Sequence, residues 1–407
     1  MHLEILLIFY CVMKSGANAV NKTDDAKNLT EIGRIHDTLA MKILMPTVKN
    51  PQNTVISTLS IQLSFCKLAS VARGAAKEEL MKALGFTKDE MIDNFYANVR
   101  DMLLRLQQSD LTHINEIYLD YKSSINMSFA ENSTLHYGVR VAKVSYMYPT
   151  AATTFINNAI STATYRRVED IIQPKDINNL TSIVLVYAAH FKPSWEMQFD
   201  HTRTKKRKFY GYDKSVIEVP MMAKLDEFLL HDFKDFKILS TRLRSWGATM
   251  TFVLPTFLNI DGFLNILQHD PDLLKKAKKL MKWKHVRLVM PSVKMKCHHD
   301  LIGFLRQVGI KEVLDRNSTG LNAILNEGAV NASNLYVSNI KQKVFLEMDE
   351  FGVYRVNKEI LDLLPQPMEP PGTQEFVLDH PFYFTVSLEP TETETYQLFS
   401  GVYYRPE

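Results

Sequence analysis

Several sequence signals are scarce or absent in this chain of 407 residues, and each narrows what the protein can be. Its 3 Cys are too few for a fold held together by disulfides. The 15 Gly and 16 Pro form no Gly/Ser linker or low-complexity segment after residue 20, and there is no internal repeat, so nothing divides the chain into independent domains. No run reaches the roughly 18 to 20 apolar residues that a membrane-spanning helix needs.

Charge and catalytic motifs exclude further classes of function. The 48 Lys and Arg against 45 Asp and Glu leave a net charge of only +3, which gives no reason to expect a nucleic-acid partner. The sequence contains no G-x-S-x-G, H-E-x-x-H, C-x-x-C or G-x-G-x-x-G motif. His298, His299 and Asp300 are adjacent, but neighbouring His on an exposed turn are usually solvated. We therefore expect no enzyme, no metal site and no cofactor.

The N-terminus has the pattern of a signal peptide. The apolar run from Ile5 to Met13 is followed by Ala17-Asn18-Ala19, which fits an A-x-A cleavage site. This predicts removal of residues 1–19 and a secreted, extracellular protein that begins near Val20. A retained anchor is the alternative, and Glu4 is atypical of the first segment of a signal peptide.

Two cysteines remain in the expected mature chain, Cys66 and Cys297, and they allow one bridge at most. Cys66 lies within an apolar pattern of helical spacing. That setting favours a buried thiol over a disulfide.

The expected secretion makes the seven N-x-S/T sites of the mature chain candidates for glycosylation. We predict glycosylation at six of them: Asn21, Asn28, Asn126, Asn132, Asn317 and Asn331. Asn179 is the doubtful site, because it comes just before the apolar run from Ile183 to Ala189, which we expect to be buried.

Hydrophobic periodicity predicts helices in the first half of the chain and strands in the second. Apolar residues recur at helical spacing from Ile61 to Leu84, and Gly85 is a helix stop, so we expect a helix pair there. Strand-like runs follow at 182–187, 216–219, 249–254, 286–290, 335–340, 344–348 and 382–388. This segregation predicts an α+β fold with mainly antiparallel sheets, built as one domain over residues 20–407.

Several short motifs follow one another along the chain: Asn53 to Ile61, Gly74 to Phe86, Leu185 to Trp195, Val219 to Met222, Phe252 to Pro255, Tyr336 to Ser338, Phe376 to Val386 and Phe399 to Val402. This ordered set resembles the serpins, the serine protease inhibitor family. The resemblance implies three β-sheets, about eight or nine helices and an exposed reactive loop. The stretch from Glu350-Phe351-Gly352 to the motif that begins at Phe376 resembles the family's reactive loop together with the hinge that precedes it. We place this hinge and loop at residues 351–375.

In family inhibitors the reactive loop is cut by the target protease and then inserts as a new central strand of a β-sheet. The protease is trapped only if insertion precedes hydrolysis of the acyl-enzyme. Insertion and hydrolysis therefore compete, and each 1.4 kcal/mol added to the insertion barrier slows that step about tenfold.

The hinge of this chain departs from the family's inhibitors, which carry Thr or Ser and then small residues after the Gly. The corresponding residues here are Gly352, Val353, Tyr354, Arg355, Val356, Asn357 and Lys358. Alternate residues of a strand share a face, and the resemblance places Arg355, Asn357 and Glu359 on the face toward the protein body. An unpaired buried charge costs several kcal/mol, so we predict slow insertion and weak or absent inhibition.

The expected cleavage site agrees with this prediction. Counting as in family members places the scissile bond at Gln366–Pro367, and most serine proteases refuse Pro after that bond. Arg355 and Lys358 offer trypsin-like cleavage, but both lie too near the hinge to leave an arm that could carry a protease.

The family resemblance assigns two regions of the large sheet. The shutter is a hydrogen-bonded cluster beneath the sheet, and the breach is the region at its top. Ser57 and Ser60 keep the family's hydroxyl groups, and Trp195 is retained at the breach. Tyr187 stands where the family usually has Asn, and Gln342 where it often has His. Because Tyr is much larger than Asn, we expect this region to be packed differently.

The strongest local charge signal lies between Leu273 and His285, where a helical wheel gathers five lysines on one side: Lys275, Lys276, Lys278, Lys279 and Lys282. A second basic run, Lys205 to Lys208, would extend this patch if the fold brought the two together. Some serpins bind sulfated glycosaminoglycans through basic helices, so polyanion binding is one interpretation. A solvated helix face is the other.

Together these features indicate a monomeric, secreted serpin-family protein that binds a partner or acts as a decoy without trapping proteases. The partner is a serine protease, a polyanion or another secreted protein. One alternative is a working inhibitor of an unusual serine or cysteine protease, and another is a storage or structural protein.

Overall fold

The computed structural model describes residues 22–245, 247–256, 259–327, 334–353, 369–389 and 395–406, with side chains from Gly33 onward. Several predicted features lie outside these residues: the signal peptide 1–19, the sites Asn21 and Asn331, the hinge residues Tyr354 to Lys358, and the bond Gln366–Pro367. Asn28 lies in a described helix, but its side chain is outside the description.

One of the two sheets in the described residues has five strands. Their order is β10 (Val293–Asp300), β11 (Val337–Met348), β4 (Ile183–Phe191), β2 (Leu111–Asp120) and β3 (Arg140–Val144). The central pair, β11 and β4, is parallel, whereas β4 and β2 are antiparallel. Every residue of β4 is buried, as expected for a strand covered on both faces. The expected runs 335–340 and 344–348 belong to one strand, β11.

The second sheet joins nine strands in the described residues. Their order is β1 (Thr54–Ile56), β14 (Tyr396–Tyr403), β13 (Phe382–Leu388), β8 (Ala248–Pro255), β7 (Phe236–Arg242), β6 (Val216–Asp232), β9 (Lys282–Pro291) and β12 (Gln374–Val377), with β5 (Lys205–Tyr210) paired to β6. The family resemblance predicts three sheets. Two of these are hydrogen-bonded into one here, because β6 has 17 residues and pairs with both β7 and β9.

Nine α-helices occur in the described residues, which confirms the expected α+β fold. They are α2 (Lys22–Thr47), α3 (Thr58–Ala69), α4 (Gly74–Leu84), α5 (Glu90–Gln107), α6 (Met127–Tyr137), α7 (Pro149–Ala163), α8 (Ile260–His269), α9 (Leu273–Lys278) and α10 (Ile302–Gln307). The expected helix pair is α3 and α4, and Gly85 ends α4 in the left-handed conformation with φ 74°. None of the described helices is long and apolar enough to span a membrane.

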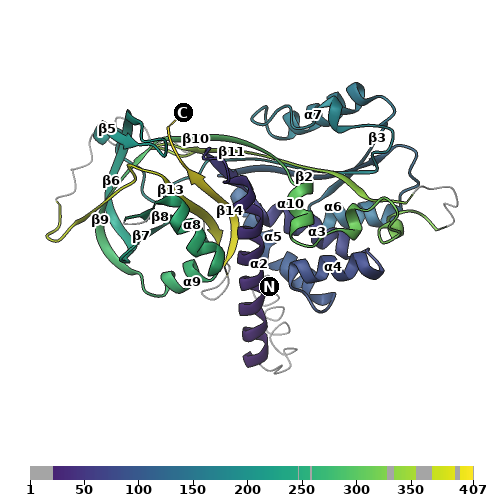
Figure 1. The fold of residues 1–407 in the computed structure, drawn as a ribbon, viewed down its shortest axis with the longest axis horizontal. Helices are drawn as coiled ribbons and strands as arrows, with labels where there is room; N and C mark the ends of the chain where they lie inside the picture. The colour runs from purple at the N-terminus through teal and green to yellow at the C-terminus, as the bar shows by residue number, and fades with distance from the viewer. Residues whose placement is uncertain are drawn as a thin grey trace, which may run out of the picture.

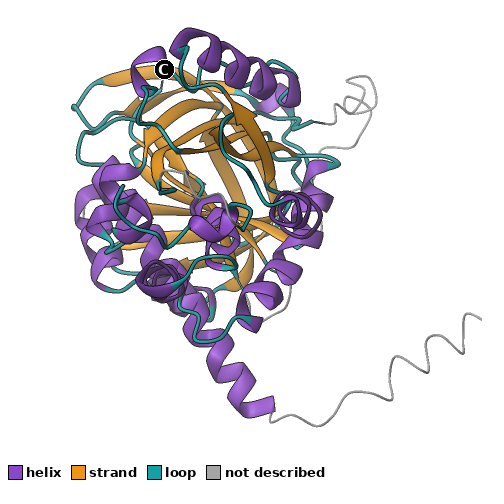
Figure 2. Ribbon diagram, turned by 90° about the vertical axis from the view of Figure 1, so that its right-hand side faces the viewer, coloured by secondary structure: helices purple, strands orange, loops and turns teal. Residues whose placement is uncertain are grey.

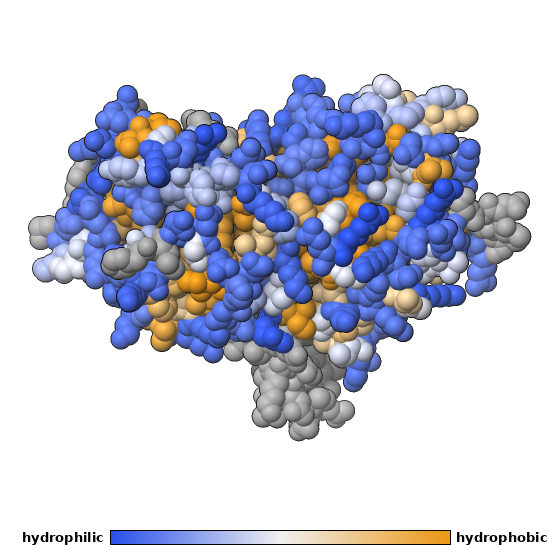
Figure 3. All heavy atoms as spheres, viewed as in Figure 1, coloured by the Kyte–Doolittle hydropathy of each residue, from blue (hydrophilic) through white to orange (hydrophobic). Residues whose placement is uncertain are grey.

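The helices cover the five-stranded sheet unequally. Helix α7 lies alone on one face, and the larger helical layer that includes α3, α4 and α6 lies on the other (Figure 1). Seen from the side, the strands lie between these two layers (Figure 2). The face of the molecule seen in Figure 3 is mostly hydrophilic, with apolar residues gathered in separate patches.

A buried lysine interrupts the apolar layer between α3 and α6. Lys67 is only 2% exposed, and its Nζ lies 4.4 Å from the ring centre of Phe129 and 5.1 Å from that of Tyr137. These cation–π contacts replace part of the lost hydration of the ammonium group. Burial lowers the pKa of Lys67 to about 8.

We predict that Lys67→Met stabilises the fold at neutral pH and removes a pH dependence. The native pKa lies below that of the unfolded chain, so between about pH 8 and pH 10.5 the unfolded state binds more protons. Lys67 therefore adds a contribution to stability that rises with pH across this window, and Lys67→Met lacks that contribution. Denaturation in urea at a series of pH values measures both slopes, and equal slopes would contradict the prediction.

Candidate functional site: the hinge and the sheet beneath it

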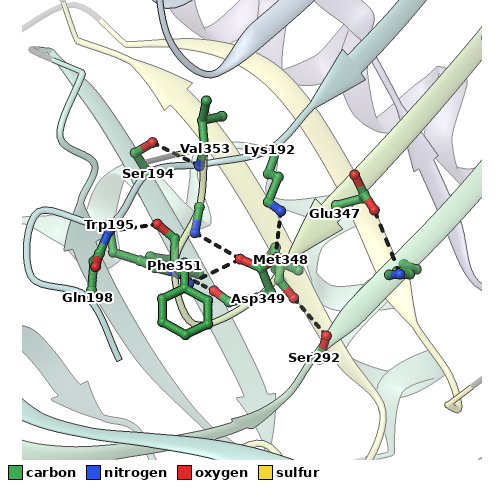
Figure 4. A network of polar contacts seen from close by, with 12 residues as sticks. Lys192, Ser194, Trp195, Gln198, Ser292, Glu347, Met348, Asp349, Phe351 and Val353 are labelled. Atoms are coloured by element: carbon green, nitrogen blue, oxygen red, sulfur yellow. Dashed lines mark hydrogen bonds and ion pairs between the residues drawn. The ribbon is translucent and has the colours of Figure 1, made fainter. Parts of the chain in front are cut away.

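The chain leaves β11 in a turn that is fastened to the segment after β4. The indole Nε1 of Trp195 donates to the carbonyl oxygen of Asp349 at 2.7 Å, and Lys192 Nζ lies 2.6 Å from Asp349 Oδ2 (Figure 4). Trp195 is 1% exposed, so the first of these bonds is protected from water. Trp195, predicted at the breach, thus holds the base of the hinge.

Asp349 also shapes the turn itself. Its Oδ1 accepts hydrogen bonds from the backbone N–H of Phe351 at 3.1 Å and of Gly352 at 2.8 Å. Gly352 has φ +68°, and a Cβ there would lie 2.5 Å from the carbonyl oxygen of Pro193. Only glycine meets both conditions without displacing the backbone. Sequence analysis missed Asp349, although an Asp three residues before Gly is a typical turn signal.

The remaining hinge groups are held by residues that follow β4 in sequence. Phe199 N–H donates to the Glu350 carbonyl oxygen at 3.1 Å, and Thr204 Oγ1 donates to Glu350 Oε1 at 2.7 Å. Gln198 Nε2 donates to the Phe351 carbonyl oxygen at 2.8 Å. The last described contact is the hydrogen bond from Val353 N–H to Ser194 Oγ at 3.4 Å, and Val353 itself is 45% exposed.

Below the hinge, the two central strands are paired along nearly their whole length. The parallel ladder of β11 and β4 runs from Val337 opposite Ile183 to Leu346 opposite Phe191. At the end of the ladder near the hinge, His190 Nε2 and Glu347 Oε2 lie 2.8 Å apart across the two strands. A strand entering here would have to separate this seam and break its hydrogen bonds.

The predicted shutter residues Ser57, Ser60 and Gln342 are brought together under the seam. Gln342 Oε1 accepts from Ser57 N–H at 2.8 Å, while its Nε2 donates to the Ser57 carbonyl oxygen at 2.8 Å and to Ser60 Oγ at 3.0 Å. All three residues are nearly inaccessible to water. The amide of Gln342 therefore ties β11 to the start of α3.

Tyr187 lies beside this cluster, directly opposite Gln342 in the β4–β11 ladder. It is 6% exposed, and its burial raises the pKa of the phenol. The His113 ring lies 5.9 Å from the Tyr187 ring. The space under the seam is thus occupied by an aromatic pair beside the polar cluster.

The basic residues are arranged differently from the predicted amphipathic helix. Helix α9 ends at Lys278, and Lys282 already belongs to β9. Lys276 pairs with Asp270 at 2.7 Å, and Lys278 pairs with Glu389. Lys275 is half-buried, while Lys279 and Lys282 are exposed and make no ion pair within the described part of the chain.

The second basic run does not extend this patch. Residues 205–208 form strand β5, at the upper left of Figure 1, whereas α9 lies at the lower left. The fold therefore keeps the two runs apart.

The described glycosylation sites are accessible to different degrees. Asn132 and Asn317 are exposed, and Asn126 caps α6, its Oδ1 accepting from Ser128 N–H at 2.9 Å. Asn179 is exposed too, because the buried strand begins only at Ile183. Its neighbouring apolar run is therefore no reason to exclude it.

The remaining candidate groups lie within the fold. Cys66 and Cys297 are both buried, and neither forms a disulfide in the structure. His298 and His299 lie in β10 rather than on a turn, and His299 Nε2 is 2.9 Å from the Val55 carbonyl oxygen. Within the described residues, no group of three or more His, Cys, Asp or Glu side chains is arranged to hold a metal ion.

Comparison with known proteins agrees with this geometry. The model of the family Serpin (serine protease inhibitor) matches residues 35–406, and the chain belongs to that family. Alaserpin of Manduca sexta is 26% identical over 389 residues, covering 94% of this chain and 96% of that protein.

Solved structures share the fold. Native protease nexin-1 with heparin has a TM-score of 0.80 at 22% identity, covering 93% of this chain and 100% of that one. Serpin48 of the insect Tenebrio molitor has a TM-score of 0.76 at 22% identity, covering 96% of this chain and 100% of that one.

We predict that Gly352→Ala loosens the hinge turn. The new Cβ adds a clash with Pro193 to the strain of a left-handed backbone, which together cost about 1–3 kcal/mol. Gly372→Ala is the matched control, because φ there is +80° but a Cβ meets nothing within 4 Å. Urea unfolding followed by tryptophan fluorescence should show a larger loss of stability for Gly352→Ala. Equal losses would mean that the contact with Pro193 contributes nothing.

Proposed function

We propose that this serpin binds a partner or acts as a decoy and does not trap proteases by loop insertion. The observation that carries the proposal is the sequence after Gly352, where insertion would bury Arg355, Asn357 and Glu359 against the protein body. Desolvating these groups raises the insertion barrier, and hydrolysis of the acyl-enzyme then wins.

Two features of the described fold bear on loop insertion. The seam between β11 and β4 is closed by a ladder that runs without a register shift from Asn339 to Leu346, and the hinge is fastened through Val353. Neither feature distinguishes a binder from an inhibitor by itself, since an inhibitor is also closed before cleavage. They are the contacts that a cut loop must break before it inserts, and the polar hinge sequence would form few favourable contacts in their place.

Secretion and glycosylation complete the proposed function. The apolar run and A-x-A site at the N-terminus support export, and the exposed Asn132, Asn179 and Asn317 would then be available to glycosylation. No catalytic role is part of the proposal. The second candidate is a functional inhibitor of an unusual serine or cysteine protease, favoured by membership of the inhibitor family.

We predict that cleavage in the loop, at Lys358 or farther toward Pro371, leaves the thermal midpoint of the protein unchanged. The cut arm stays outside the sheet because its inward residues are charged or polar and would lose their hydration on insertion. Thermal melts of intact and cleaved protein measure the difference. A rise of tens of degrees would overturn the proposal and favour the inhibitor.

A hinge variant with small residues serves as the positive control for this experiment. In Val353→Thr/Arg355→Ala/Asn357→Ala/Glu359→Ala the inward positions are small, so cleavage should raise the midpoint. If the variant also fails to gain stability, the closed seam rather than the hinge sequence prevents insertion.

We also propose polyanion binding at the α9–β9 corner, through Lys279 and Lys282. Their exposure supports this, as does the heparin complex of protease nexin-1, a protein of the same fold. The partners of Lys276 and Lys278 already neutralise those two charges.

We predict that Lys279→Ala/Lys282→Ala elutes from immobilised heparin at lower salt than the native protein, because fewer counterions are released on binding. Lys276→Ala should change elution less. Lys206→Ala, on the distant β5, is the matched control and should leave elution unchanged. If all variants elute with the native protein, these lysines form only a solvated surface.

A further inference from the structure

One edge of strand β2 is open along half of its length. Strand β3 pairs with β2 only from Glu116 to Asp120. The preceding residues, 111–115, pair with β4 on one edge, and no strand of the described chain lies along the other. Sheet edges of this kind present unpaired backbone groups and are usually covered or blunted.

Two hydrogen bonds reveal which backbone groups face the open edge. Lys192 N–H donates to the Asp110 carbonyl oxygen on the β4 side, and Tyr121 N–H donates to the Val144 carbonyl oxygen on the β3 side. The backbone groups of successive strand residues point to alternate edges, and the β2–β4 ladder has no bulge. His113 and Asn115, in step with Tyr121, therefore direct their backbone N–H groups toward the open edge.

A cavity of about 700 Å³ adjoins this edge beneath α7. Helix α7 lines it with Phe155, Ala159 and Ala163, and the short alanines create the space. Phe155 is 51% exposed at the rim. The volume lies in the range of peptide- and drug-sized sites.

The charges at the cavity are already balanced. Arg140 forms an ion pair with Glu116, whose side chain is fully buried and also accepts a hydrogen bond from the Tyr118 hydroxyl. Arg140 is thereby held in place where β3 begins. The site therefore favours a ligand that brings backbone hydrogen bonds and apolar side chains over an ionic one.

We propose that this groove binds an extended peptide segment of a partner protein. The segment adds a short strand to the open edge of β2, in line with β3, and places an apolar side chain against Ala159 and Ala163. Backbone hydrogen bonds to His113 and Asn115 give affinity, and the space under α7 selects the side chain. The inference names a partner surface for the binding role proposed above, but it does not depend on the reactive loop.

The test uses short random peptides displayed on phage and selected on the full-length protein. Ala159→Trp fills the groove, whereas Ala151→Trp places the same ring on an exposed position of the same helix. Selected peptides should bind the native protein and Ala151→Trp alike and lose about tenfold or more in affinity for Ala159→Trp. Hydrogen exchange should slow in residues 111–115 when peptide is bound.

A second measurement separates strand addition from simple burial of a side chain. N-methylation of alternate backbone positions in a selected peptide should abolish binding in one register and spare the other. Thermal melts check that both tryptophan variants are folded. If Ala159→Trp is not folded, Ala163→Trp takes its place. The proposal is wrong if no groove-dependent peptide is selected, or if bound peptides protect another segment.

The loop-cleavage melts are independent of this experiment. A cleaved loop that inserts would overturn the non-inhibitory role and leave the groove standing. A groove that selects no peptide would leave the non-inhibitory role untouched.

Discussion

The parallel pairing of β11 with β4 is the constraint on which the rest of the structure depends. It closes the five-stranded sheet, sets the position at which the hinge begins, and covers the cluster of Ser57, Ser60 and Gln342. Parallel ladders are slightly weaker per residue than antiparallel ones, so the seam is the natural place for the sheet to open. In this protein, the buried amide of Gln342 ties the middle of β11 to the start of α3, and the contact of His190 with Glu347 joins the two strands near the hinge.

Insertion into the sheet and exposure to solvent place opposite demands on the sequence of the loop. A loop that inserts must be small and neutral on its inward face, whereas a loop exposed to solvent is free to carry charge. The chain follows the second demand after Gly352 while keeping the buried contacts of Trp195 and Asp349. The fold of the family is therefore retained around a loop whose composition supports the non-inhibitory role proposed above.

Much of the fold followed from the sequence because its signals are local. The apolar residues of β4, the helix stop at Gly85 and the ordered family motifs each predict a structure that is present. Errors arose where one pattern fits two structures. The lysines of 275–282 fit a helical wheel, but after Met281 the chain alternates as a strand, and no local rule decides between them.

The candidate site was only partly predictable, for a different reason. Gln342 and Tyr187 were identified by position, but the fastening of the hinge by Lys192, Gln198 and Thr204 comes from residues about 150 positions away in sequence. Such pairings depend on the closed topology. An Asp shortly before a Gly predicts a turn, but only the fold shows that the indole of Trp195 holds this turn through the carbonyl oxygen of Asp349.

Strand β6 carries a consequence beyond its place in the fold. Because the continuous backbone of β6 pairs with β5 near its start, with β9 over its middle and with β7 at its end, neither half of the nine-stranded sheet can lose its strand without deforming its neighbour. The sheet should therefore unfold cooperatively, as a single block. In a rearrangement of the molecule, the nine-stranded sheet built on β6 would then move as a rigid body. The five-stranded sheet would open between β11 and β4.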